Sequence, residues 1–307
     1  MHTPHALNPW FRLFRLPNLL SVPGDPLAGF LIAAAGHVDR AMFLPMLAVM
    51  AASVCLYMFG LALNDIVDIE TDRIERPDRP LPSGQITVAQ AKAAAIAAAL
   101  SGLNLAWVAG LTALCVAGVL AFTILAYNRF KRLSVLGVCA MGLCRGLSAL
   151  LGVAAVRPEW FAECPGRLAI PVGLAVAVVF AYVVAVSVIA KDETADEKPM
   201  GFARWMPFVV LLVGLPCVLM TMGQTEGVMP VVAVFLMCMA LMWAWVLGGM
   251  MYRVQPVPDT VAGHIRNLLR VQACLCAAAG SAGLFPALFL MALSFVFPRL
   301  ARRFYSS

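Results

Sequence analysis

Nine apolar stretches, each close to the length that crosses a bilayer, dominate this chain of 307 residues. A transmembrane helix requires about 20 predominantly apolar residues, and soluble domains carry roughly 25% charged residues. Here 12% of the residues are charged. These features predict an all-α, polytopic membrane protein with about nine transmembrane helices in a single domain, residues 1–307. The stretches cover residues 19–36, 42–64, 88–109, 111–127, 134–156, 168–190, 206–223, 228–250 and 271–297.

The distribution of basic residues predicts the orientation. With the N-terminus in the cytoplasm, 14 Lys and Arg residues lie in inner loops and six in outer loops, as the positive-inside rule favours. The tail with Arg299, Arg302 and Arg303 disagrees, because nine spans place it outside. We expect a multi-pass protein of the cell inner membrane, and scattered basic residues do not suggest a nucleic-acid partner. The long polar loops predicted to face the cytoplasm are 65–87, 128–133, 191–205 and 251–270.

An acidic cluster follows the second apolar stretch directly. At about 100° per residue, Asn64, Asp68 and Asp72 fall on one helical face over two turns, with Asp65 at its edge. Pro77 and later Pro80 end the helix, because proline lacks a backbone donor. Crowded carboxylates repel one another unless a cation lies between them, and oxygen ligands suit Mg²⁺. The four residues are therefore candidate metal ligands; the alternative is a solvated charged loop.

A second acidic cluster follows the apolar stretch that ends at Ala190. Asp192 and Asp196 are four residues apart and so share a helical face. Both clusters follow the second span of a quasi-repeat, about 19–127 and 134–250, with a final helix after them. Facing each other across one cavity, the clusters could hold two or three Mg²⁺ ions and a diphosphate.

Basic side chains accompany both clusters. Arg79, Lys131 and Lys191 either grip a diphosphate or anchor the chain by the positive-inside rule. Two further charges, Asp25 and Arg145, lie within apolar spans. Charges inside a membrane usually face a polar cavity or a partner, so the two either line a cavity or form a structural pair.

These motifs resemble those of the UbiA superfamily of intramembrane prenyltransferases, over essentially the whole chain. The similar segments are Asn64-x-x-x-Asp68-x-x-x-Asp72 with Arg79-Pro80-Leu81-Pro82-Ser83-Gly84, Asp192-x-x-x-Asp196, Tyr127-x-x-x-Lys131 and Arg15-Leu16-Pro17-Asn18. The resemblance implies a helical bundle with a central cavity and Mg²⁺-dependent transfer of a prenyl group from a prenyl diphosphate to an aromatic or other lipophilic acceptor.

The resemblance also implies roles for individual residues. The metal would be held by Asn64, Asp68, Asp72, Asp192 and Asp196, the four aspartates among these being the catalytic residues. The diphosphate would contact Arg79, Tyr127, Lys131 and Lys191, while Arg15, Asp25 and Arg145 would face the acceptor or the cavity.

One departure from the family pattern keeps a second function open. Many members carry a further Asp after a Gly in the second motif, whereas Phe202 follows Gly201 here. Either Glu193 or Glu197 takes the place of this missing Asp, or the site binds fewer metal ions. The chain also fits a divergent, accessory-type member, and one alternative is a carrier that binds a prenyl or polyprenyl phosphate without chemistry. An ion-coupled transporter built on Asp25 and Arg145 is a third reading.

Overall fold

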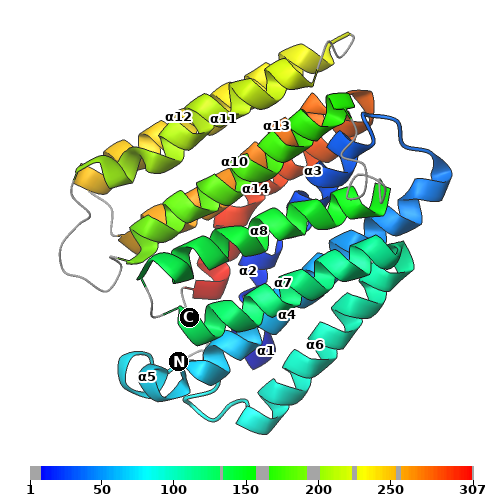
Figure 1. Cartoon of the computed structure of the whole chain (residues 1–307). Coiled ribbons are helices and arrows are strands. Elements are labelled where there is room, and N and C mark those ends of the chain that lie inside the picture. Colours follow the sequence, from blue (N-terminus) through cyan, green and yellow to red (C-terminus); the bar gives the residue numbers. More distant parts are fainter. Residues whose placement is uncertain are drawn as a thin grey trace.

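The fold is described from a computed structural model of the chain, which covers residues 8–131, 134–156, 166–191, 201–222, 227–253 and 257–305. Within these residues the regular elements are helices, and no strand is present. The long helices run roughly side by side as one bundle (Figure 1). The prediction of an all-α membrane fold is confirmed.

The first predicted span, 19–36, is a broken helix. The span itself contains α3 (Gly24–Ala33), and two short helices, α1 (Pro9–Leu13) and α2 (Leu16–Leu19), lead into it. Pro23 cannot donate a backbone hydrogen bond, and Arg15 adopts a left-handed φ of 45°, so the chain cannot continue as one helix. The break leaves the carbonyl of Ser21 for side chains to satisfy.

The middle of the chain follows the hydropathy pattern closely. It forms α4 (Phe43–Val67), the short α5 (Ile69–Glu75), α6 (Val88–Ala109), α7 (Leu111–Phe130) and α8 (Ser134–Val156). Gly110, with a φ of 127°, turns the chain between α6 and α7 into the predicted hairpin. A capping box of Thr87 and Gln90 fixes the start of α6.

The last third of the chain corrects two predictions. After α10 (Gly166–Lys191), α11 (Met206–Thr221) and α12 (Met229–Arg253), the chain forms α13 (Val257–Ala278) and α14 (Leu284–Tyr305). The predicted single span 271–297 is therefore wrong, since the chain turns at Gly280, which has a φ of 110°. The predicted loop 251–270 is wrong as well, because most of it forms the first half of α13.

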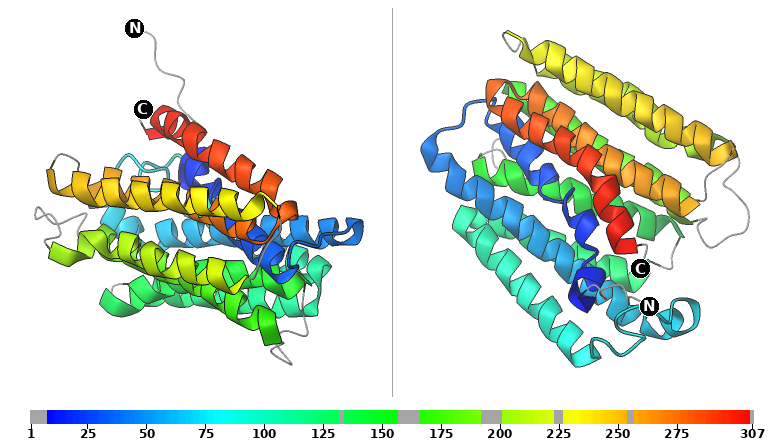
Figure 2. Two further views of the ribbon diagram at one scale, coloured as in Figure 1. Left: turned by 90° about the horizontal axis from the view of Figure 1, so that it is seen from above. Right: turned by 180° about the vertical axis from the view of Figure 1, so that it is seen from behind.

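The hairpin of α13 and α14 changes the position of the C-terminal tail. The end of α14 lies at the same end of the bundle as α1 and α5, as Figure 2 shows from behind. Arg299, Arg302 and Arg303 belong to the last turns of α14. The tail therefore no longer conflicts with the charge distribution of the remaining loops.

Two hydrophobic cores hold the bundle together. One core lies among α4, α6, α7 and α8. The other lies among α3, α8, α10, α11, α12, α13 and α14. Seven described helices are long and apolar enough to cross a membrane: the helical stretches 40–67, 88–109, 111–130, 135–156, 168–191, 202–221 and 229–250. A multi-pass membrane protein is thus supported, whereas the count of nine spans is not confirmed.

Candidate active site

The first acidic cluster keeps its predicted register across a break in the helix. α4 ends at Val67 and α5 begins at Ile69, yet the amide of Asp68 donates to Asn64 O (3.0 Å) and the amide of Asp72 to Asp68 O (2.8 Å). This i to i+4 pattern keeps the three residues in helical register, but only Asn64 and Asp68 line the same cavity, and Asp72 is buried. α5 ends at Glu75, two residues before Pro77, as predicted.

Each carboxylate of the cluster faces a basic side chain. Lys131 Nζ lies 2.6 Å from Asp68 Oδ2, and Arg79 Nη1 lies 2.6 Å from Asp72 Oδ2. Asp65 Oδ1 is 3.3 Å from Arg15 Nη2 and 3.7 Å from Arg79 Nη1. The mutual repulsion expected of these carboxylates is therefore offset by cations of the protein itself.

Asn64 connects the Asp68–Lys131 pair to α4. With its amide oriented to satisfy both neighbours, its nitrogen donates to Asp68 Oδ2 (3.2 Å) and its oxygen accepts from Lys131 Nζ (2.9 Å). The three side chains form a closed triangle at the end of α4.

A polar cavity of about 460 Å³ opens above this triangle. Its wall is rich in cations, because it contains four basic side chains and one carboxylate, Asp68. Asp65 and Asp72 are buried behind it, being 5% and 3% exposed. Such a wall suits a polyanion such as a diphosphate. The lining residues are Arg15, Asn64, Asp68, Arg76, Arg79, Tyr127 and Lys131.

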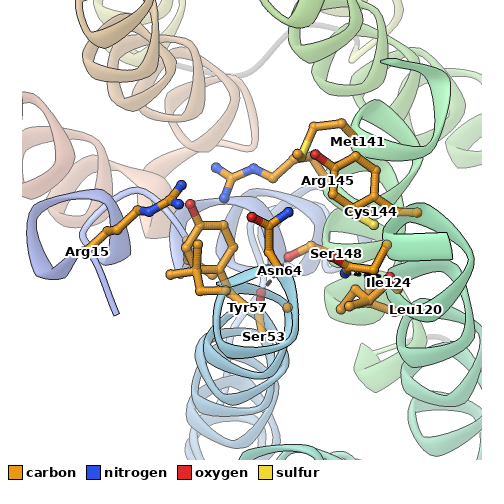
Figure 3. Close-up of a pocket in the computed structure, with 15 residues that line it drawn as sticks. Arg15, Ser53, Tyr57, Asn64, Leu120, Ile124, Met141, Cys144, Arg145 and Ser148 are labelled. Carbon is orange, nitrogen blue, oxygen red and sulfur yellow. Dashed lines mark hydrogen bonds between the residues drawn. The ribbon is translucent and has the colours of Figure 1, made fainter. Parts of the chain in front are cut away.

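An apolar cavity adjoins the polar one. The second cavity, about 180 Å³, lies between α4, α7 and α8 and shares Arg15, Asn64 and Tyr127 with the first. Its wall is mostly carbon, contributed by side chains such as Leu120, Ile124 and Met141. Figure 3 shows Arg15 and Arg145 pointing toward one another across it.

Arg145 lines this cavity and also forms a buried ion pair. Its Nε lies 2.7 Å from Asp25 Oδ2, and its Nη2 donates to Ser21 O (3.0 Å). Gln272 Nε2 donates to Asp25 Oδ1 (2.6 Å) and to Ser21 O (2.8 Å). Asp25 is fully buried and lies behind Arg145 rather than among the described residues of the cavity wall. The pair thus secures the break between α2 and α3.

The second acidic cluster cannot be placed. Asp192 and Asp196 lie outside the described residues, so the approach of Asp196 to Asp68, which we expect at about 7–12 Å from Mg²⁺–oxygen distances, stays a prediction. Lys191 ends α10 with an exposed side chain and is not among the described residues that line the two cavities.

Sequence reasoning missed several residues of the site. Tyr57 lines the apolar cavity, and the hydroxyls of Ser53 and Ser148 lie 2.6 Å apart at its far end. A signal was present on α4, because Ser53, Tyr57, Asn64 and Asp68 follow one face of an otherwise apolar helix. Gln272 gave no such signal, since its partner Asp25 lies 247 residues away.

The described side chains offer oxygen ligands for a metal ion without forming a closed metal site. Within these residues, no three acidic, His or Cys side chains converge on one point. Asn64 and Asp68 present oxygens to the polar cavity, and Asp68 retains 26% side-chain exposure. Oxygen donors of this kind fit Mg²⁺, which keeps several waters and shares itself with substrate phosphates.

Comparison with known proteins identifies relatives over most of the chain. Residues 26–256 match the model of the UbiA prenyltransferase family. Digeranylgeranylglyceryl phosphate synthase of Methanoculleus marisnigri is 30% identical over 206 residues, which are 67% of this chain and 69% of that protein. The Saccharolobus solfataricus protein of the same name is 30% identical over 151 residues, so the match spans about half of it, 51%.

The fold has solved relatives as well. A UbiA homologue from Archaeoglobus fulgidus, bound to DMAPP and Mg²⁺, superposes with a TM-score of 0.58 at 18% identity. That alignment covers 86% of this chain and 99% of the other. At this identity the likeness establishes the fold.

Proposed function

Because the chain belongs to the UbiA prenyltransferase family, we propose that it transfers a prenyl group from a prenyl diphosphate to a lipophilic acceptor within the membrane, with Mg²⁺. One observation carries the proposal: a cationic polar cavity adjoins an apolar one and shares three lining residues with it. A prenyl diphosphate has the same division into a polyanionic head and an apolar tail.

The basic side chains of the polar cavity are assigned to the diphosphate. Arg79 and Lys131 now hold Asp72 and Asp68, and phosphate oxygens are stronger partners for them because they carry more charge. If Arg79 and Lys131 turned toward the diphosphate, they would stabilise the departing anion. Their movement would also expose the carboxylates of Asp72 and Asp68. Tyr127, at the junction of the two cavities, would contact the head, and Lys191 would contact it from α10.

Asn64, Asp68 and Asp72 are the proposed metal ligands on this side, with Asp192 and Asp196 opposite them. A bound Mg²⁺ would neutralise negative charge on the diphosphate and so make it a better leaving group.

Asp65 receives a different assignment. Although the sequence suggested a metal ligand, its carboxylate faces two arginines, Arg15 and Arg79, whereas that of Asp72 pairs, among the described residues, with Arg79 alone. We assign it the positioning of these two arginines.

The apolar cavity would protect the reaction. Departure of diphosphate leaves an allylic cation, which water would capture before the acceptor does. Arg145 and Tyr57 lie beside the tail and are the groups available to orient an acceptor.

Release of diphosphate from radiolabelled prenyl diphosphates tests the proposal. Protein in nanodiscs is incubated with Mg²⁺ or with EDTA, and with phenols or glyceryl phosphate lipids as acceptors. We expect acceptor-dependent, EDTA-sensitive release together with a labelled product. Tight binding of the donor without any release would indicate the carrier function instead.

The end of the bundle with the site is proposed to face the cytoplasm of an inner-membrane protein. Ser83 lies at this end, and His37 lies in the exposed loop before α4 at the other. A membrane-impermeant maleimide should label Ser83→Cys from the cytoplasmic side and His37→Cys from the outside. The reverse pattern would overturn the orientation.

A further inference from the structure

We infer that a third cavity, between the last turns of α4 and α7, binds an anionic phospholipid of the surrounding bilayer. This cavity, the lateral groove, has a volume of about 320 Å³. The inference goes beyond prenyl transfer, because the lipid does not react. The lining residues of the groove are Leu63, Val67, Leu125, Asn128, Arg129 and Lys131.

The groove lies at the level where two apolar helices end. Leu63 and Val67 belong to the last turns of α4, and Leu125 lies near the end of α7, which stops at Phe130. The 20 residues of α7 span about 30 Å, which is the thickness of the hydrocarbon core. A ligand in the groove therefore lies at the boundary between acyl chains and head groups.

The apolar part of the groove is open to the surroundings of the bundle. Val67 and Leu125 are 46% and 49% exposed, although both belong to helices that are apolar enough to cross a membrane. Lipid acyl chains are as apolar as leucine side chains, so they cover such surfaces readily. This part of the groove suits an acyl chain.

Two cations border the groove at the level of the head groups. Arg129 is exposed, and none of the ion pairs between described residues involves it. The ammonium of Lys131 has three N–H donors and directs two of them to Asp68 Oδ2 (2.6 Å) and the side-chain oxygen of Asn64 (2.9 Å). The described lining of the groove contains no acidic side chain. The guanidinium of Arg129 and one donor of Lys131 are therefore available to an anion.

An anionic phospholipid has the same arrangement, with a phosphate at the head-group level and acyl chains below it. Basic pockets between transmembrane helices recognise the head groups of anionic lipids, and each cation near the membrane surface adds to the attraction. Prenyl diphosphate is an anionic amphiphile as well, but the polar cavity offers it four basic side chains and the groove only two. The groove is thus assigned to the lipid that surrounds it.

Retention of lipid by the full-length protein tests this assignment. The protein is placed in nanodiscs with equal parts of phosphatidylglycerol and phosphatidylcholine of identical acyl chains, and is then extracted into mild detergent. Native mass spectrometry identifies the lipids that stay bound. We expect phosphatidylglycerol to be enriched about tenfold over phosphatidylcholine, because two cations contact its phosphate and no positive charge on the head group repels them.

Substitutions at the groove should change this enrichment. Arg129→Gln should lower it about fivefold, whereas Arg129→Lys keeps the charge and should retain most of it. Leu125→Trp fills the apolar part of the groove without changing any charge, and it should lower the amount of phosphatidylglycerol that stays bound.

Lys92→Gln is the matched control. Lys92 is an exposed cation in the first turns of α6, which packs against both α4 and α7, but it does not line the groove. This variant should keep the full enrichment. A loss as large as that of Arg129→Gln would overturn the inference, because general attraction to the membrane surface would then explain the enrichment. Equal retention of the two lipids by the unaltered protein would overturn it as well.

A second measurement distinguishes the lipid from the prenyl diphosphate. A radiolabelled, unreactive geranyl S-thiolodiphosphate should bind equally well to Arg129→Gln and to the unaltered protein in nanodiscs with Mg²⁺. A large loss of this binding, with the phosphatidylglycerol enrichment unchanged, would assign the groove to the prenyl diphosphate instead. The lipid measurement contains no prenyl diphosphate, so its result does not depend on the proposed function.

Discussion

Two groups of charges lie at the membrane-embedded helices, and they are held in opposite ways. In the acidic cluster of α4 and α5, each of the three aspartates contacts long basic side chains, and four such side chains line a wide polar cavity. In the buried pair, both oxygens of Asp25 are engaged, by Arg145 from α8 and by Gln272 from α13. The first group can exchange partners with a ligand, whereas the second is fixed from three helices.

This difference shows that the contacts of a charge, rather than its presence in a membrane span, indicate its use. Asp25 is completely buried, with its carboxylate paired with Arg145 and accepting from Gln272, and these contacts do not favour a transported ion. Asp68 is partly exposed and faces a cavity rich in cations. We therefore propose that the first group serves prenyl transfer and that Asp25 serves architecture, while Arg145 both holds Asp25 and faces the apolar cavity.

Breaking the buried pair should have the largest effect on stability. Arg145→Ala would leave Asp25 charged and buried without its ion pair, and the loss of one partner of such a pair costs about 3–5 kcal/mol. For a chain of this size we expect the thermal midpoint in detergent to fall by about 10 °C. Differential scanning fluorimetry with intrinsic tryptophan emission measures it.

A paired substitution serves as the control. Asp25→Asn combined with Arg145→Met removes both charges and should recover part of the lost stability. If Arg145→Ala alone left the midpoint unchanged, the pair would not secure the α2–α3 break.

Substitutions in the acidic cluster of α4 and α5 should change activity rather than stability. Asp68→Ala removes the carboxylate that faces the polar cavity, and turnover should fall about 100-fold or more, as for other groups that stabilise developing charge. The thermal midpoint should change little, because Asp68 is partly solvent-exposed. Diphosphate release at saturating Mg²⁺ measures the effect, and near-normal turnover would exclude Asp68 as a metal ligand.

Asp65→Asn should have an intermediate effect. The substitution keeps the shape of the side chain but removes the charge that holds Arg15 and Arg79, and loss of such outer partners typically costs about 10–100-fold. We expect the lower part of this range, mainly as a higher KM for the prenyl diphosphate. A loss as large as that of Asp68→Ala, without a change in KM, would favour a metal ligand instead.

The sequence predicted those features that depend on residues near one another in the chain. Hydropathy located α4, α6, α7, α8, α10, α11 and α12, and the helical period correctly placed Asn64 and Asp68 on one side. Pro77 marked the end of α5 because its effect on the backbone is local.

Features that depend on distant residues were missed. α13 carries His264, Asn267 and Arg270, which lower its hydropathy and made it resemble a loop. In the bundle these polar groups are buried, with His264 Nδ1 3.2 Å from the hydroxyl of Tyr182 and Asn267 donating to Ala240 O (3.0 Å). Likewise, Ser53 and Ser148 meet across 95 residues. No local pattern contains such pairings.

The smallest effect is expected at Arg73, which lies in the same acidic segment as Arg79. Arg73 Nη1 contacts both oxygens of Glu70, at 2.8 and 3.0 Å, but the two side chains are 56% and 77% exposed. An exposed pair of this spacing contributes at most about 0.5 kcal/mol, since water and salt screen it. Arg73→Ala should leave the thermal midpoint and diphosphate release nearly unchanged, whereas Arg79→Ala should lower turnover because Arg79 holds Asp65 and Asp72 and lines the polar cavity. Equal losses in the two variants would mean that net charge near the membrane surface matters and that the contacts of each arginine do not.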